Sequence, residues 1–169
     1  MKQIFLVRHS KSDWDTPFDR DHNRGLSLRG IKNANSLRKV LKLYGIYPEK
    51  AFISDARRAV ETFKILNRRK ELLSNFSITP ELYDCNPSQY LEIIKNLNND
   101  IKSVLFLGHN PELEAVANIL IGGAKQNLFQ KYSTSSLLSL SFERDEWKYV
   151  AEQPNGKINF FWIPPKTKT

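Results

Sequence analysis

Four side chains that can hold or attack a phosphoryl group each follow a short apolar run of the sequence. Arg8 and His9 come directly after QIFLV, Arg58 lies a few residues after AFIS, and His109 comes directly after SVLFLG. Arginine stays charged and forks two donors onto phosphate, whereas histidine titrates at about pH 6.5 and serves as nucleophile or as cation. The combination predicts phosphoryl transfer, with His9 attacking and Arg8, Arg58 and His109 completing the catalytic set.

A second group of residues is expected at the border of this pocket. Residues 10–28 are polar and form a long connection, and such loops often carry function. Lys11 and Ser12 are the predicted substrate-binding residues of this loop, although either is equally compatible with ordinary loop surface. An alkoxide leaving group needs a general acid, for which Glu81 or Asp84 in TPELYDCNP is a candidate, whereas a leaving imidazole needs less help.

The elements between these residues predict how they are positioned. The apolar runs are too short for amphipathic helices and indicate strands buried on both faces. Helical periodicity separates them, over residues 31–44, 59–66, 90–97 and 113–120. Alternating strands and helices predict an α/β fold with three layers, α/β/α, around a mostly parallel sheet. Ligands bind outside the carboxyl ends of such strands, so we expect the four catalytic candidates to meet there.

The pattern changes after residue 121. SSLLSLSF and WKYVAEQ alternate around the charged turn ERDE, and INFFWI follows the turn signal Asn155-Gly156. We therefore expect antiparallel C-terminal strands that finish the sheet, and a short further strand at FSIT before Pro80. Asn110 and Pro111 are expected to cap and to begin the helix that follows His109.

Composition limits the classes of protein. The 169 residues fit one domain, 1–169, with one cysteine, Cys85, and no pattern of a secretory signal, so a cytoplasmic protein is expected. No apolar run approaches the roughly 18 residues that span a bilayer. The net charge of +8 favours anionic partners, but charge alone does not choose among nucleic acid, membrane and phosphorylated substrate. Lys64, Arg68, Arg69 and Lys70 are expected to be a solvated helix face.

Three motifs, in order, resemble the histidine phosphatase superfamily, which has the phosphoglycerate-mutase-like fold. LVRHSKSDW resembles its opening signature, SDARRAVET its second motif and FLGHNPELE its third, most closely as they occur in the SixA-type phosphohistidine phosphatases. The resemblance implies that His9 is the nucleophile, that Arg8 and Arg58 bind phosphate, and that His109 is the second histidine. It also implies that the usual general acid is absent.

Two positions depart from the family pattern. Ser10 stands where glycine or alanine is usual, which we expect to matter little. Asp55 stands where proline or serine is common, and we expect its carboxylate to cap the following helix and to point away from the pocket. His22, in the loop among Asp19, Asp21 and Arg24, has no placement at a strand end and is expected to be an ordinary loop residue.

The predicted reaction is phosphate removal through a phosphohistidine intermediate on His9, without a metal or another cofactor. Arg8, Arg58 and a protonated His109 would neutralise the transferring group. Phosphohistidine in a protein is the expected substrate, and a small phosphorylated metabolite is the alternative; a non-catalytic binder of phosphate or nucleic acid is a third. We expect no nucleic-acid or membrane partner, because binding to either would not explain histidines at strand ends. We expect a monomer, although no motif decides the oligomeric state.

Overall fold

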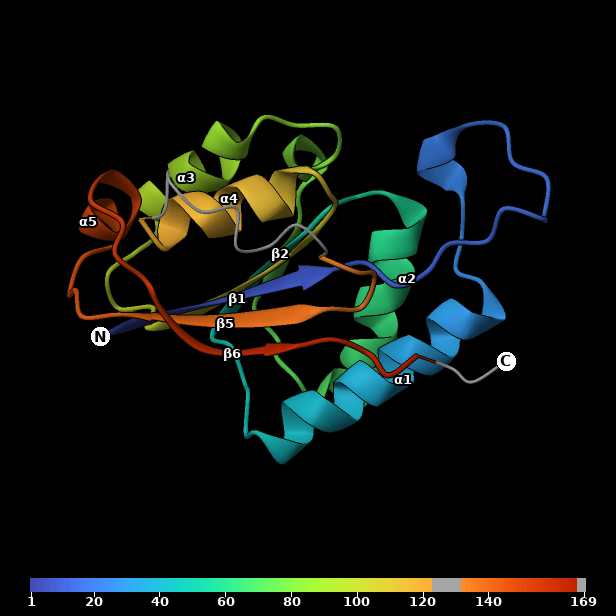
Figure 1. Ribbon diagram of the computed structural model, residues 1–169, viewed down its shortest axis with the longest axis horizontal. Coiled ribbons are helices and arrows are strands. Elements are labelled where there is room, and N and C mark those ends of the chain that lie inside the picture. The colour runs from blue at the N-terminus through green and yellow to red at the C-terminus, as the bar shows by residue number, and fades with distance from the viewer. Residues whose placement is uncertain (123–131, 167–169) are drawn as a thin grey trace.

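A six-stranded sheet with helices on both faces forms the centre of the molecule (Figure 1). The computed structural model describes residues 1–122 and 132–166. The strands are β1 Lys2–Arg8, β2 Lys50–Ile53, β3 Phe76–Ile78, β4 Ser103–Gly108, β5 Leu137–Phe142 and β6 Lys157–Trp162. The helices are α1 Leu28–Leu43, α2 Arg57–Leu66, α3 Pro87–Lys95, α4 Glu112–Leu120 and α5 Trp147–Glu152, with 3-10 turns η1 Asp21–Asn23, η2 Arg68–Lys70 and η3 Pro80–Leu82.

The strand order is β3-β2-β4-β1-β5-β6. The first four strands of the chain are parallel to one another, β5 runs antiparallel to β1, and β6 runs antiparallel to β5. The α/β class, the mostly parallel sheet, the antiparallel pairing near the C-terminus and the short strand at FSIT are therefore confirmed. Because β2, β4 and β1 are neighbours, their carboxyl ends lie side by side at one edge of the sheet.

The predicted strand at WKYVAEQ is wrong, because residues 147–152 form α5. Trp147 and Val150 are buried and lie one helical turn apart, so both side chains reach the core from one face of a helix. The indole Nε1 of Trp147 donates to the carbonyl oxygen of Ile101 at 2.9 Å. A strand would have placed these two side chains on opposite faces.

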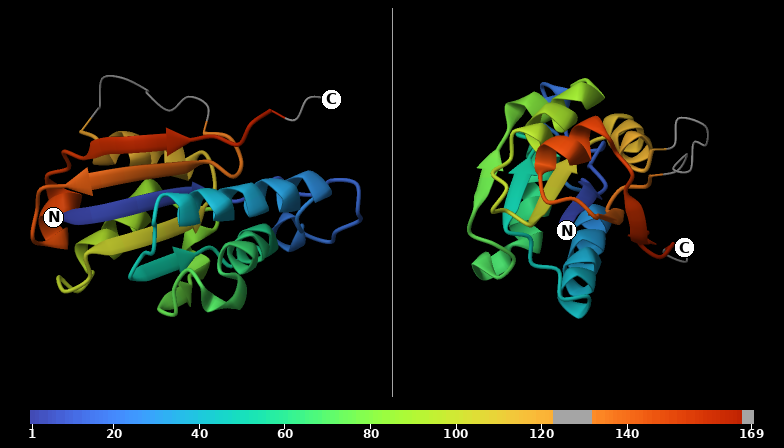
Figure 2. Two further views of the ribbon diagram at one scale, coloured as in Figure 1. Left: turned by 90° about the horizontal axis from the view of Figure 1, so that it is seen from below. Right: turned by 90° about the vertical axis from the view of Figure 1, so that its left-hand side faces the viewer.

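The two faces of the sheet are packed by alternate residues of β1. Ile4 and Leu6 pack with α3, α4 and α5, while Phe5 and Val7 pack with α1 and α2. Figure 2 shows these two helical layers on either side of the strands. Both layers shield the inner strands β1, β4 and β5 from water, so the ends of these strands are held in a rigid frame.

Local signals fix the helices that surround the site. Ser27 caps α1 by accepting from the backbone N–H of Gly30, and Asn86 and Gln89 form a capping box at the start of α3. Lys64, Arg68, Arg69 and Lys70 are exposed, as expected. Within residues 1–122 and 132–166, none of the helices combines the length and apolar character needed to cross a bilayer.

Candidate active site

Three of the four predicted catalytic side chains meet at the carboxyl ends of β1, β2 and β4. His9 follows β1, His109 follows β4, and Arg58 lies in the first turn of α2, just after β2. The two imidazole rings are 4.9 Å apart between centroids. Arg58 Nε lies 3.3 Å from Nε2 of His9, and its terminal nitrogen lies 3.5 Å from Nδ1 of His109. These three residues form the pocket floor, and each is only 6% exposed.

His9 is held in one tautomer by the backbone. Its Nδ1 lies 2.7 Å from the carbonyl oxygen of Ser10, which accepts only, so Nδ1 carries the proton and donates it. Nε2 therefore presents its lone pair toward Arg58. Burial, followed by the nearness of His109 and Arg58, holds the pKa of His9 well below its ordinary value. His9 is a neutral imidazole with a directed, nucleophilic nitrogen.

Arg8 points toward the chain that precedes β5. One terminal nitrogen donates to the carbonyl oxygen of Tyr132 at 2.6 Å. Its Nε is buried and has no hydrogen-bond partner among the described residues. The charge of Arg8 contributes to the lowered pKa of both His9 and His109, so it acts on the pocket floor electrostatically.

His109 is neutral in the free protein. Burial, followed by the charge of Arg58, lowers the pKa of His109 to about 3, so its neutral form prevails near pH 7. The prediction of a protonated His109 concerns the site with a phosphoryl group bound; in the free protein, burial and the nearby guanidinium of Arg58 favour the neutral ring. Arg58 donates toward Nδ1, and Nε2 lies 2.8 Å from Oγ of Ser54, which fixes the second ring.

Asp21, from the loop before α1, holds the outer side of Arg58. Arg58 donates to the backbone oxygen of Asp21 at 2.8 Å and to its Oδ2 at 3.0 Å. Tyr83 and Arg24 donate to the same carboxylate. Burial would raise the pKa of Asp21, but the hydrogen bond from Arg24 and the charge of Arg58 outweigh it and lower the pKa to about 2. The loop thus borders the pocket, as predicted, through a residue that sequence reasoning missed.

The hollow above His109 and Arg58 is lined by carboxylates and by Tyr83. Asp21, Asp84 and Glu112 line it, whereas Glu81 does not. Of the two acids considered for proton donation, the structure therefore places Asp84 at the pocket and Glu81 outside it. Tyr83 packs edge-on against the ring of His109, with centroids 5.5 Å apart.

Lys11 and Ser12 do not line this hollow. Ser12 is buried, and its hydroxyl accepts from a terminal nitrogen of Arg24. Lys11 is exposed, and its backbone oxygen accepts from Ser27. Both residues brace the loop against itself, so the structure does not bring the two predicted substrate-binding residues to the pocket.

Two predicted helix caps are wrong. Asp55 does not cap α2; its carboxylate pairs with Nε2 of His22 at 2.9 Å, and this contact raises the pKa of His22. Asn110 does not cap α4, because its amide donates to Glu114 and to the backbone oxygen of Tyr132. The partner of Asp55 comes from a distant loop, whereas Asn110 donates to Glu114 in α4 itself and to the distant carbonyl oxygen of Tyr132.

The second motif contributes two residues that join the loop to the pocket floor. Thr62 accepts from the backbone N–H of Ser10 at 3.0 Å and donates to the carbonyl oxygen of Arg58 at 2.7 Å. Glu61 accepts from the backbone N–H of Leu26 at 2.8 Å. In the sequence, the adjacent Glu and Thr at the end of SDARRAVET are the feature from which this link between the loop and the pocket floor could have been predicted.

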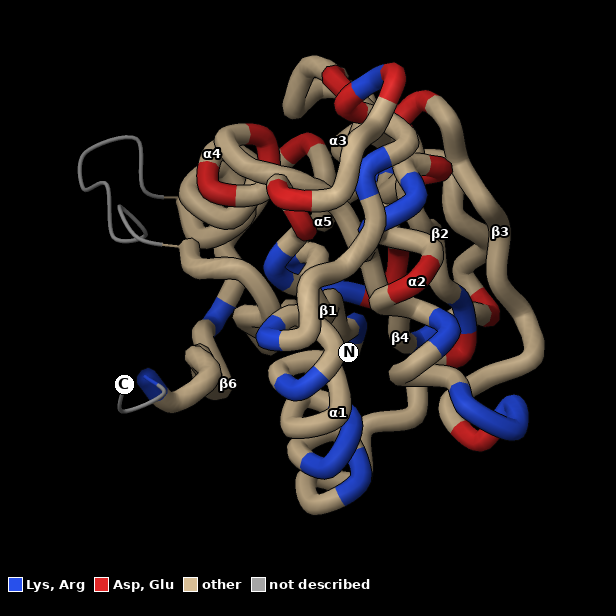
Figure 3. Tube along the Cα trace, turned by 90° about the vertical axis from the view of Figure 1, so that its right-hand side faces the viewer, with Lys and Arg blue, Asp and Glu red and all other residues tan. Residues whose placement is uncertain are grey.

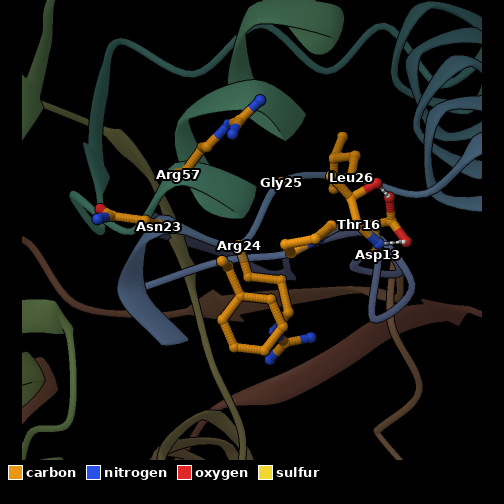
Figure 4. Close-up of a pocket in the computed structure, with 9 residues that line it drawn as sticks. Asp13, Thr16, Asn23, Arg24, Gly25, Leu26 and Arg57 are labelled. Carbon is orange, nitrogen blue, oxygen red and sulfur yellow. Dashed lines mark hydrogen bonds between the residues drawn. The ribbon is translucent and has the colours of Figure 1, made fainter. Parts of the chain in front are cut away.

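A separate hollow lies between the loop and α2 (Figure 4). Arg57 borders it from α2, and Arg24 borders it from the loop. The guanidinium of Arg24 stacks on Trp14, 3.6 Å from the ring centroid, with Phe18 further out at 5.8 Å. No histidine is among the described residues that line the hollow, and the stacking of Arg24 on Trp14 stabilises the loop. Among the described residues, no group of three or more His, Cys, Asp or Glu side chains is arranged to hold a metal ion.

Comparison with known proteins gives one family and a consistent fold. The model of the histidine phosphatase superfamily, branch 1, matches residues 4–95, more than half of the chain. An uncharacterised chloroplast protein of Arabidopsis thaliana is 30% identical over 132 residues, which are 73% of this chain; the chain spans 61% of that protein's length.

Two solved structures show the same architecture. A candidate phosphohistidine phosphatase, SixA, of Agrobacterium tumefaciens is 25% identical, with a TM-score of 0.82 and coverage of 96% of this chain and 98% of that one. A mycobacterial glucosyl-3-phosphoglycerate phosphatase bound to VO3 is 15% identical, with a TM-score of 0.74 and coverage of 98% and 100%.

Proposed function

Because the chain belongs to the histidine phosphatase superfamily, we propose that it hydrolyses phosphohistidine in proteins through a covalent intermediate on His9. One observation carries the proposal. The Nδ1–H of His9 donates to the carbonyl oxygen of Ser10 at 2.7 Å, while Nε2 faces a guanidinium at 3.3 Å. A neutral imidazole whose free nitrogen is aimed at a cation is the arrangement that in-line attack on a phosphoryl group requires.

The first step transfers the phosphoryl group to the enzyme. A phosphoryl oxygen replaces Nε2 of His9 as a partner of Arg58, and Arg8 adds positive charge nearby. The lone pair of Nε2 forms a bond to phosphorus as the bond between phosphorus and the substrate's imidazole nitrogen breaks. The departing imidazole takes up a proton. Arg58 and Arg8 neutralise the charge that develops on the equatorial oxygens.

The second step returns His9 to its starting state. Water attacks phosphorus, the bond from phosphorus to Nε2 breaks, and inorganic phosphate leaves. Each step uses charge that the chain itself supplies, so the proposed reaction needs no metal ion. The bound dianion favours a proton on His109, which then also binds a phosphoryl oxygen.

Two arguments favour phosphohistidine, whose leaving group is a nitrogen, as the substrate. Imidazole is far less basic than an alkoxide and leaves with little acid assistance. The Agrobacterium protein named SixA shares 25% of its residues across nearly the whole chain. The alternative, a phosphomonoesterase acting on a small metabolite, draws on Asp84 and Glu112, because either carboxyl group at the pocket could protonate an alkoxide.

A direct assay separates these reactions. The protein is incubated with EDTA and either a phosphohistidine peptide or a set of sugar and glycerate phosphates, and released phosphate is measured. We expect release from the phosphohistidine peptide, unaffected by EDTA, and acid-labile radiolabel on His9 after a short incubation. Faster release from a metabolite ester would favour the alternative, and release that stops on chelation would contradict the mechanism.

A further inference from the structure

The mouth of the pocket is acidic, although the chain as a whole is basic. The sequence has 26 Lys and Arg against 18 Asp and Glu, yet Asp21, Asp84 and Glu112 line the hollow above the pocket floor and Arg58 is its sole cation among the described residues. Figure 3, which faces this edge of the sheet, shows Asp and Glu on α4 and on the loop before α1, where Arg also occurs, and Lys and Arg along α1.

Two of these carboxylates are not neutralised by the protein. Asp21 is already bound by Arg58, Arg24 and Tyr83. Asp84 and Glu112, by contrast, have no ion pair and no side-chain hydrogen bond to any residue within 1–122 and 132–166. Asp84 is exposed and Glu112 is half-buried, so both carboxylates can meet a bound molecule.

The two free carboxylates come from different elements. Asp84 lies in the turn between η3 and α3, where its φ of 49° is a left-handed conformation that aspartate tolerates better than most residues. Glu112 begins α4. The hollow between them has a volume of about 300 Å³, more than a phosphoryl group fills. Groups of the substrate beside the phosphorus atom therefore pass between two negative charges.

Such a mouth selects by charge. A substrate with a carboxylate or a second phosphate near the reacting group is repelled there, whereas a cation is attracted. An extended chain can occupy both sides of the reacting group and so meet both carboxylates, which a small amine cannot.

From these observations we propose that Asp84 and Glu112 are specificity-determining residues that select phosphorylated polypeptide segments with Lys or Arg beside the phosphohistidine. The inference rests on the proposed function and adds the sequence context of its substrate. Arg58 binds the phosphoryl group at the pocket floor, and the two carboxylates bind the flanking cations at the mouth. Because the floor and the mouth carry opposite charges, the peptide enters with its phosphoryl group toward the floor and its cationic side chains toward the mouth.

Three phosphohistidine peptides of equal length test the proposal, with Lys, Ala or Glu on both sides of the phosphorylated residue. We expect kcat/KM to fall in the order Lys, Ala, Glu, with about a 3- to 10-fold difference between the extremes, as solvent-exposed ion pairs allow. The difference should shrink as salt is raised from about 0.05 to 0.5 M, because screening shortens the reach of exposed charges.

The double variant Asp84→Asn, Glu112→Gln should bring the three values of kcat/KM together. The matched control, Glu143→Gln with Glu146→Gln, removes the same charge from two exposed residues of the turn before α5 and should keep the wild-type order. A double variant that slows all three peptides by one common factor would overturn the proposal, because proton donation and not charge selection would then be the role of these acids.

The remaining outcomes are also decisive. Equal kcat/KM for the three peptides in the wild-type protein, or faster hydrolysis of a phosphorylated small amine than of any peptide, overturns the peptide selectivity while leaving the phosphatase intact. Absence of phosphate release from every phosphohistidine substrate overturns the proposed function itself, and the inference with it.

Discussion

The pocket floor and the pocket mouth use the same kinds of side chain under opposite conditions. At the floor, His9 and His109 are buried, each ring has a fixed hydrogen-bond partner, and burial lowers the pKa of both. In the loop beside the mouth, His22 packs against Tyr83 and is partly exposed, and its pairing with Asp55 raises its pKa. Strand ends thus supply rigid, neutral imidazoles for chemistry, whereas loops supply charges that can meet a substrate.

The strongest way to break this comparison is to remove one histidine from each region. His9→Ala should lower kcat by about 10³-fold or more, because no other nucleophile replaces Nε2. His22→Ala, the matched control in the loop beside the mouth, should retain most of the activity. Steady-state phosphate release and radiolabelling of the protein measure both effects; comparable losses in the two variants would contradict the division of roles.

Substitutions of the adjacent residues Arg57 and Arg58 compare an exposed arginine with a buried one. Arg58→Lys should lower kcat by about 10²-fold, because lysine cannot contact the phosphoryl group, His9 and Asp21 with one planar group. Arg57→Lys is the control, since Arg57 is exposed and pairs with Glu61 at 2.7 Å. An equal decrease of kcat in both variants would show that the buried position of Arg58 has no role in catalysis.

Titration by NMR tests the opposite pKa shifts directly. Between pH 8 and pH 5 the imidazole of His109, with a pKa of about 3, should stay neutral, whereas His22 should gain its proton above its ordinary value. Tungstate, as an analogue of the phosphoryl group, should raise the pKa of His109 by offsetting the charge of the arginines. Titration of His109 near pH 6.5 in the free protein would contradict the site as described.

The smallest expected effect is on stability. A histidine whose pKa is raised on folding stabilises the folded state below its unfolded pKa, and this contribution is lost as pH rises through the folded pKa. Asp55→Asn should therefore lower the free energy of unfolding by at most about 1 kcal/mol at pH 5.5 and by less at pH 9. Urea unfolding at both pH values measures this, with Asp15→Asn, an exposed loop aspartate, as control. An equal loss at both values would show that the pair is not ionic.

The sequence predicted the pocket floor better than the mouth for a physical reason. His9, Arg58 and His109 follow apolar runs, and parallel strands carry such positions to one edge of the sheet whatever the loops do. Asp21 reaches Arg58 across 37 residues of chain without periodicity, and no local pattern encodes that contact. Capping is a local rule and predicts caps at Asp55 and Asn110, but the distant His22 binds Asp55, and Asn110 donates to the distant carbonyl oxygen of Tyr132 as well as to Glu114.

The error at residues 147–152 has a similar origin. Trp147, Tyr149, Val150 and Ala151 satisfy a strand and a helix about equally over so short a segment. Packing against α3 decided for the helix, and that contact depends on residues about fifty positions earlier in the chain. Short segments at the edge of a sheet are where tertiary contacts most easily override local preference.

The acceptor that orients His9 belongs to the main chain, and this affects how the motif can evolve. Every amino acid at position 10 carries a carbonyl oxygen, so the proton position on the ring survives replacement of that residue's side chain. Ser10, fully buried and bonded through its hydroxyl to Ser135 at 2.6 Å, can therefore stand where the family usually has glycine or alanine. Substitutions at position 10 are therefore limited by the space around the buried side chain and not by the need to orient His9.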